Sequence, residues 1–276
     1  MWQMMKIKTV FSGAALFLIT STIMVHAGSK EITTEQYKPL NSVRVSMQRM
    51  LKSSEGRYFL RLNAGITKPH ATLYDFVENK NIDFKGTQKG DEIVLDSVEF
   101  NESLAKSVYK IVGTLNSNSG VFQSNLISNI NGNEKKIQFE PAFKVENKPV
   151  FIFKFYGNNV NTDGERLTRV DVLNKINRNV VQTLTGFSAY SKSMGYMDIN
   201  FDGYYDVLLS DLSEGKSVED KRYIYWMYNP KIQKYQRSPQ LEKIVGFPTL
   251  HGERKQIDFG NGQVYQVENG LLNKIN

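Results

Sequence analysis

Short alternations of apolar and polar residues, separated by turn residues, run along most of the chain. Segments such as YFLRLN (58–63), EIVLDSVEF (92–100), VFIFKFY (150–156) and RYIYWMYN (222–229) have the length and aromatic or β-branched content of strands. The separators carry Asn, Gly, Asp and Pro, as tight turns require. Except for a short turn near SPQLEKIV (238–245), no segment has a helical pattern. The pattern predicts an all-β protein of short, mostly antiparallel strands.

One segment, SVRVSMQRML (42–51), fits two patterns. Val43, Val45 and Met47 alternate as in a strand, whereas Leu40, Val43, Met47, Met50 and Leu51 also fall on one face of a helix. We favour a strand, because KSSEG supplies a turn directly afterwards and a strand-like run follows it.

About a dozen strands in one chain must protect their edges. A sandwich, a barrel and a small propeller all do so. A change in composition at EPAFKVENKP (140–149), where two prolines interrupt the strands, indicates two halves of one unit. We therefore expect a single all-β domain over residues 42–276, built as a sandwich, a barrel or a small propeller, whose second half begins at about residue 146.

The N-terminus has the features of an export signal. Lys6 and Lys8 precede the apolar run FSGAALFLITSTIMV (11–25), and VHA (25–27) places small residues at a cleavage site. The alternative is a membrane anchor, but the run is short and interrupted by Ser, Gly and Thr. We expect a signal peptide at 1–27, a loose polar leader at 28–41, and a periplasmic mature protein without a membrane span. The 276 residues include no Cys, so disulfides and thiol chemistry are excluded.

The stretch DINFDGYYDVLLSD (198–211) carries the clearest chemical signal. Asp198, Asn200, Asp202, Tyr204 and Asp206 occupy the first, third, fifth, seventh and ninth positions of a calcium loop, with the backbone carbonyl as the ligand at Tyr204. Gly203 at the sixth position permits the sharp bend. The twelfth position is a leucine within a strand pattern, so this is no EF-hand. We predict a Ca²⁺ site in a β-hairpin loop; the alternative is a tight turn with solvent-exposed acids.

A second stretch, NVNTDGERL (159–167), has a weaker form of the same spacing. It contains Asn159, Asn161, Asp163 and Gly164, but Leu167 stands at the ninth position and only one ligand position carries a carboxylate. We interpret it as an Asx-rich turn.

Catalytic signals are lacking in the sequence. His70 and His251 have no nucleophile pattern around them, and we expect both in surface or turn positions. A glycosidase carboxylate pair leaves no mark in sequence, so it stays an open alternative. The net charge of +7 includes no basic cluster suited to nucleic acid. We expect a protein that is not an enzyme. Its positive charge either serves solubility or suits an acidic partner surface or envelope polyanions.

The aromatic run YIYWMYNPKIQKY (223–235) allows two interpretations. Its alternation predicts a strand with one face in the core, and the other face could be a recognition patch, because Tyr and Trp dominate protein interfaces. Core packing is the favoured interpretation.

Three segments together resemble a known family. RLTRVDVLNKINRNVVQTL (166–184), GYMDINFDGYYDVLLSD (195–211) and YIYWMYNPKIQKYQRSPQLEKI (223–244) follow one another as in a group of exported bacterial proteins. Its characterised member is a periplasmic immunity protein against a lysozyme-like effector of an antibacterial type IV secretion system. The resemblance covers about residues 150–245 and implies a small calcium-bound β-propeller, with the loop at 198–206 as the metal site.

The resemblance favours a monomeric inhibitor that blocks a lysozyme-like peptidoglycan hydrolase in interbacterial competition. The alternative is a calcium-stabilised structural or adhesive module of the envelope. The loop alone does not distinguish between them, because a bound calcium would stiffen either protein.

Overall fold

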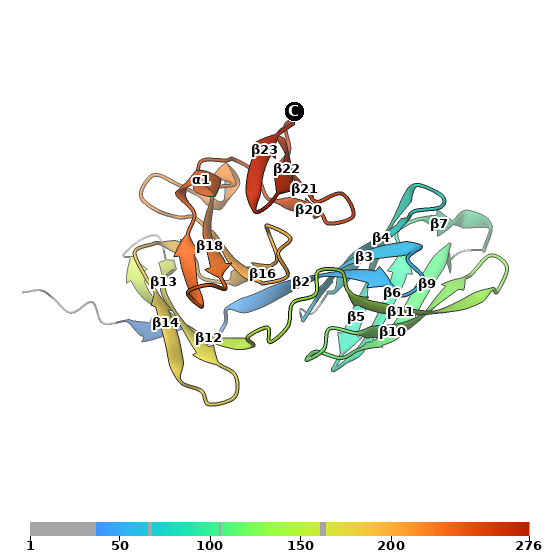
Figure 1. The fold of residues 1–276 in the computed structure, drawn as a ribbon, viewed down its shortest axis with the longest axis horizontal. Helices are drawn as coiled ribbons and strands as arrows, with labels where there is room; N and C mark the ends of the chain where they lie inside the picture. Colours follow the sequence, from blue (N-terminus) through green and yellow to red (C-terminus); the bar gives the residue numbers. More distant parts are fainter. Residues whose placement is uncertain (1–36, 66–67, 105, 161–163, 276) are drawn as a thin grey trace, which may run out of the picture. The chain divides into compact units, whose positions relative to one another are not determined.

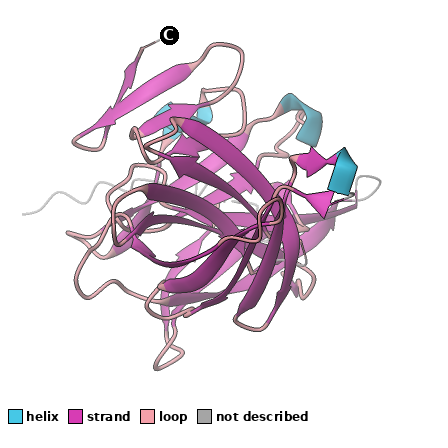
Figure 2. Cartoon of the chain, turned by 90° about the vertical axis from the view of Figure 1, so that its right-hand side faces the viewer, coloured by secondary structure: helices cyan, strands magenta, loops and turns pink. Residues whose placement is uncertain are grey.

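A computed structural model describes residues 37–65, 68–104, 106–160 and 164–275. The predicted signal peptide, the first part of the predicted leader and the tip of the stretch at 159–167 lie outside these residues. The fold is built almost entirely of strands, joined by turns and short helical segments (Figure 2). The prediction of an all-β protein with mostly antiparallel pairing is confirmed.

The first half of the chain forms a closed antiparallel barrel. Its neighbouring strands follow the order β11-β10-β9-β6-β5-β4-β3-β2, and β11 pairs again with β2 to close the ring (Figure 1). Closure leaves the ring without a free sheet edge. The eight strands are β2 (Arg44–Ser53), β3 (Tyr58–Ala64), β4 (His70–Asp75), β5 (Lys80–Lys89), β6 (Glu92–Ser97), β9 (Tyr109–Leu115), β10 (Phe122–Ser128) and β11 (Glu134–Pro141).

Alternating apolar residues fill the barrel. In β3, Leu60 and Leu62 are fully buried, and in β6 the same holds for Ile93 and Leu95. A small accessory hairpin, β7 (Phe100–Asn101) and β8 (Lys106–Ser107), joins β6 to β9. Strand β2 follows the favoured interpretation of the ambiguous segment.

The rest of the chain forms three groups of antiparallel strands, the second of which continues the sheet of the barrel through β2. The first contains β1 (Lys38–Pro39), β12 (Phe151–Val160), β13 (Gly164–Asn174) and β14 (Val180–Leu184), with β15 (Ala189–Tyr190) beside β13. The second contains β16 (Ser193–Met197), β17 (Asp206–Ser210), β18 (Tyr223–Asn229) and β19 (Lys234–Arg237). The third contains β20 (Thr249–His251), β21 (Gln256–Asp258), β22 (Val264–Glu268) and β23 (Leu271–Lys274).

The middle sheet is apolar on both faces. One face packs Val207, Ile224 and Tyr228 against β13 and β14, and the other packs Leu208 and Tyr225 against β20 to β22. The aromatic run at 223–235 is therefore core on both sides of β18, and the alternative of a recognition patch on its second face is wrong. The turn predicted near SPQLEKIV is the short helix α1 (Pro239–Glu242), which adds Leu241 to the second face.

The end of the predicted leader is not loose. Lys38 and Pro39 pair with β12, and Leu40 is buried beside Leu167. The sequence pattern did not indicate this edge strand, because the segment is mostly polar and only Leu40 is buried.

Strand β2 belongs to both halves. Residues Arg44–Met47 pair in parallel with β16, whereas Leu51–Ser53 pair on the same edge with β11. The first connection extends the barrel sheet into the middle sheet, and the two partners diverge between Met47 and Leu51.

Candidate functional site

The acidic loop joins two neighbouring strands of the middle sheet. It follows β16 at Asp198 and ends where Asp206 begins β17, and Met197 faces Asp206 across the hairpin. Leu209, at the twelfth position, lies within β17. The sequence prediction of a loop between two strands, and not of an EF-hand, is confirmed.

Asp198 holds the loop in its bend. Its Oδ1 accepts a hydrogen bond from the Asp202 amide at 3.0 Å, and its Oδ2 accepts one from the Gly203 amide at 2.9 Å. Gly203 has a φ of +89°, and a Cβ there would lie 2.7 Å from the Val145 side chain. The glycine is thus required both by backbone conformation and by the close approach of the segment 142–150.

Asp206 ties the loop to the neighbouring strand β18. Its carboxylate is fully buried and accepts hydrogen bonds from the Ile199 amide at 2.9 Å and the Tyr228 amide at 2.8 Å. Because both oxygens serve backbone donors, this side chain has a structural role whether or not a metal is bound.

In the rest of the loop, not every buried polar atom has a hydrogen-bond partner. Asp202 accepts hydrogen bonds from the Tyr204 amide at 2.9 Å and from the Asn200 Nδ2 at 2.9 Å. The Oδ1 of Asn200 is buried and has no hydrogen-bond partner among the described residues. A buried acceptor without a donor is unfavourable, and a cation would satisfy it.

Burial also disfavours the charged form of the aspartates in the loop. Burial, together with the nearby charge of Asp202, raises the pKa of Asp198 to about 7. Burial raises the pKa of Asp206 well above its ordinary value. Lys148 faces the loop: burial lowers the pKa of its amine to about 8, although Asp198 and its neighbours oppose this by attraction.

The donor set fits calcium in its chemistry, since carboxylate, amide and carbonyl oxygens are the ligands this ion prefers. The predicted residues do lie on one loop. However, over the described residues no three His, Cys, Asp or Glu side chains converge closely enough to hold a metal ion. The carboxylates of Asp198 and Asp206 are turned toward backbone amides instead, so calcium stays a prediction.

The buried acids predict a specific pH dependence in metal-free buffer. Because the folded-state pKa of Asp198 lies at about 7, above its ordinary 3.8, the folded chain binds protons more tightly than the unfolded chain. The free energy of unfolding should therefore fall as pH rises from about 4 to about 7, by roughly 3 kcal/mol. Urea denaturation in EDTA at several pH values measures this.

Two checks accompany that measurement. Asp198→Asn should reduce the slope between pH 5 and 7, and Asp206, whose pKa is also raised, accounts for the slope that remains. Millimolar calcium should remove most of the slope, because the ion favours the charged carboxylates. Asp75, Asp171 and Asp211, whose pKa values are lowered, affect stability only at more acidic pH. A wild-type stability that does not change from pH 5 to 7 in EDTA would contradict the expectation.

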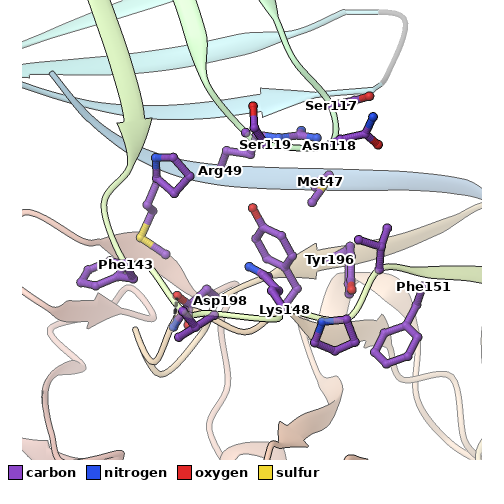
Figure 3. A pocket seen from close by; sticks show the side chains of 18 of the residues that line it. Met47, Arg49, Ser117, Asn118, Ser119, Phe143, Lys148, Phe151, Tyr196 and Asp198 are labelled. Carbon is purple, nitrogen blue, oxygen red and sulfur yellow. Dashed lines mark hydrogen bonds between the residues drawn. The ribbon is translucent and has the colours of Figure 1, made fainter. Parts of the chain in front are cut away.

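A cavity of about 1130 Å³ adjoins the loop (Figure 3). Its lining includes Asp198, Lys148, Tyr196 and Arg49, which come from the loop, the connecting segment 142–150 and strands β16 and β2. Sequence reasoning missed both cations. Little in the sequence indicated either residue. Arg49 is a charged residue among the apolar positions of a strand, and Lys148 lies in the segment between Pro141 and Pro149.

His70 and His251, the two histidines among the described residues, lie away from this loop. His70 is exposed at the start of β4. His251 is half-buried, with its Nδ1 3.3 Å from Glu253 and 3.4 Å from Arg61. The expected surface or turn position is therefore confirmed for His70 but only in part for His251, whose neighbour Glu253 is almost fully buried.

Comparisons with known proteins add little to this description. No family model matches the chain, and no curated protein matches it significantly. A crystal structure of a putative 6-phosphogluconolactonase from Bacteroides uniformis aligns over 82% of this chain and 83% of its own, with 8% identity and a TM-score of 0.32. Hydrazine synthase from Kuenenia stuttgartiensis aligns over 86% of this chain and 80% of its own, with 10% identity and a TM-score of 0.30. Over the described residues, no helix is long and apolar enough to cross a membrane.

Proposed function

We propose that this protein is a calcium-stabilised inhibitor that binds a lysozyme-like peptidoglycan hydrolase in the periplasm and so acts as an immunity protein. The loop at 198–206 is the observation that carries the proposal, together with the segments that resemble such proteins. Its buried acids and the unpartnered Asn200 Oδ1 favour a cation. The proposed ligands are the side chains of Asp198, Asn200, Asp202 and Asp206 and the carbonyl of Tyr204.

Calcium would contribute charge neutralisation and rigidity. The loop contacts the segment 142–150 through Gly203, and Asp206 fixes it to β18. A bound ion would therefore stiffen the loop and the elements around it before a partner arrives. Preorganised loops lose less entropy when they bind, which favours tight inhibition without turnover.

The arrangement of sheets is compatible with the propeller-like fold that the resemblance implies. Three groups of antiparallel strands follow the barrel, the middle one continuous with the barrel sheet through β2, and this middle group has an apolar interface with each of the others. We propose that this half, from about residue 146, is the propeller-like part and the binding scaffold. Cleavage after residue 27 would remove Lys6 and Lys8 and no acid, so the charge falls from +7 to +5 in the mature chain. This charge suits a partner whose catalytic cleft contains carboxylates, as the clefts of most glycoside hydrolases do.

A cell-wall lysis assay tests the function. The mature chain (28–276), added to a lysozyme-type hydrolase in millimolar calcium, should stop lysis at a one-to-one ratio. Asp202→Asn should weaken inhibition at least tenfold, because it removes a charged ligand but keeps an acceptor for the Tyr204 amide. If lysis is complete with every hydrolase tried, although calcium raises the melting temperature, the inhibitor proposal fails. The alternative, a structural or adhesive module of the envelope, then takes its place.

Asp258→Asn is the matched control. Asp258 makes the same kind of turn, accepting a hydrogen bond from the Gly260 amide at 2.7 Å, but it lies in β21 outside the loop. This variant should inhibit as the wild type does. An equal loss in both variants would point to general destabilisation and would count against a role for calcium.

A further inference from the structure

The cavity beside the loop exists because β2 changes partners. β2 leaves β16 after Met47 and meets β11 only at Leu51, so Arg49 lies at the fork between the two. The segment 142–150 and the turn at 117–121 complete the lining. The volume of about 1130 Å³ lies slightly above the usual range of about 300–1,000 Å³ for small-molecule sites.

Much of the cavity wall is apolar. The side chains that provide it come from β2, the connecting segment and β12, and they offer aliphatic and aromatic surface to a ligand. They are Val45, Met47, Phe143, Val145, Phe151 and Phe153.

Arg49 is the least expected residue in the lining. Its side chain is only 7% exposed, yet the described residues provide no hydrogen bond or ion pair to its guanidinium group. Arginine carries five donors, and a buried cation without acceptors is unfavourable. Burial accordingly lowers the pKa of this guanidinium. An anion in the cavity would supply the acceptors that the protein does not.

Lys148 adds a second cation to the same wall. Its ammonium group lies over the Tyr205 ring, 3.4 Å from the ring centre, and it is near enough to Arg49 for repulsion to lower its pKa in addition to burial. Figure 3 shows Arg49 on the side of β2 and Lys148 on the side of the acidic loop. The lining has three carboxylates: Glu140 pairs with Lys144, Asp198 accepts from backbone amides, and Glu146 forms no ion pair with Arg49 among the described residues.

We propose that this cavity binds an amphipathic monoanion: a carboxylate or phosphate head that accepts hydrogen bonds from Arg49 and Lys148, with an acyl or aromatic body against the apolar wall. This inference does not depend on calcium or on hydrolase inhibition, because it uses the cavity alone. Charge-assisted hydrogen bonds fix the head, and burial of apolar surface holds the body.

Isothermal titration calorimetry with dodecanoate, below its micelle concentration, tests the proposal. The mature chain should bind one dodecanoate, and dodecyl trimethylammonium and dodecyl maltoside should bind at least tenfold more weakly. A parallel titration with dodecyl phosphate shows whether the site prefers a fatty-acid or a phospholipid type of head. Inorganic phosphate alone should bind weakly; if it binds as tightly as dodecanoate, the apolar wall has no role and the proposal fails.

Three variants make the test specific. Arg49→Gln and Lys148→Gln should each weaken dodecanoate binding about tenfold or more, and circular dichroism shows whether each folds. Arg254→Gln removes an arginine charge outside the cavity and should bind as the wild type does. If Arg49→Gln does not fold, the dodecanoate affinity of Lys148→Gln tests the proposal in its place. Unchanged affinity in the folded cavity variants, or no dodecanoate binding at all, overturns the proposal.

Discussion

Replacing Asp206 with asparagine is expected to destabilise the protein by about 2–4 kcal/mol, even in the absence of calcium. The carboxylate is fully buried, and its two oxygens accept the amides of Ile199 and Tyr228. An asparagine offers one oxygen, so its NH₂ group would face one of these donors and leave it without an acceptor. The substitution changes the volume very little, which leaves the hydrogen bonds as the cause.

Urea denaturation in EDTA and in calcium measures this effect. A structural role predicts that most of the loss persists in EDTA, whereas a pure ligand role predicts a loss that appears only with calcium. Asp83→Asn is the control, because Asp83 is exposed on β5 and its carboxylate accepts a hydrogen bond from the Thr72 hydroxyl and not from a backbone amide among the described residues. A variant as stable as the wild type in EDTA would contradict the hydrogen-bond network described for the loop.

The second large effect is expected in the barrel, where Gly86→Ala should cost at least about 3 kcal/mol. An added Cβ at this position of β5 would lie 1.8 Å from the Val94 carbonyl oxygen and 2.8 Å from the Leu95 Cα. Both atoms belong to the backbone of the paired strand β6, so no side-chain rotation relieves the clash. Strands β5 and β6 must therefore move apart or shift against each other. Because the barrel is closed, this displacement also strains the neighbouring strand pairs.

Thermal and urea unfolding of Gly86→Ala check this expectation. Thr87→Ala is the matched control, since it places the same side chain at the next position of β5, where the residue is exposed. That change should stay below about 1 kcal/mol. Gly90→Ala, where an added Cβ meets no atom within 4 Å but φ is +60°, separates steric clash from backbone strain. Equal small losses in all three variants would refute the steric argument.

The sequence was most informative where local chemistry decides the structure. Alternation predicted β2 to β6 and β9 to β14, and the prolines at 141 and 149 marked the passage from the barrel to β12. The acidic spacing placed a hairpin loop between two strands, with Gly203 at its bend. Each of these features depends on residues within a few positions of one another.

Features that depend on distant partners were beyond such reasoning. Nothing in β11 or β2 alone specifies that Phe139 pairs with Ser53, so closure of the barrel could not be predicted. The hairpin loop implied a strand before Asp198, but the parallel pairing of that strand, β16, with the distant β2 could not be predicted. Both faces of β18 are buried because two other sheets cover them, which a single strand's pattern does not reveal.

The shared strand β2 sets an order for folding on a chain made from its N-terminus. The eight barrel strands are complete once Pro141 has been made, but the residues Arg44–Met47 must wait for β16, near residue 193. During that interval an open strand edge is available to any other extended chain. We therefore expect a fragment that ends near residue 150 to associate with itself, and the boundary at the two prolines is a poor place at which to divide the protein.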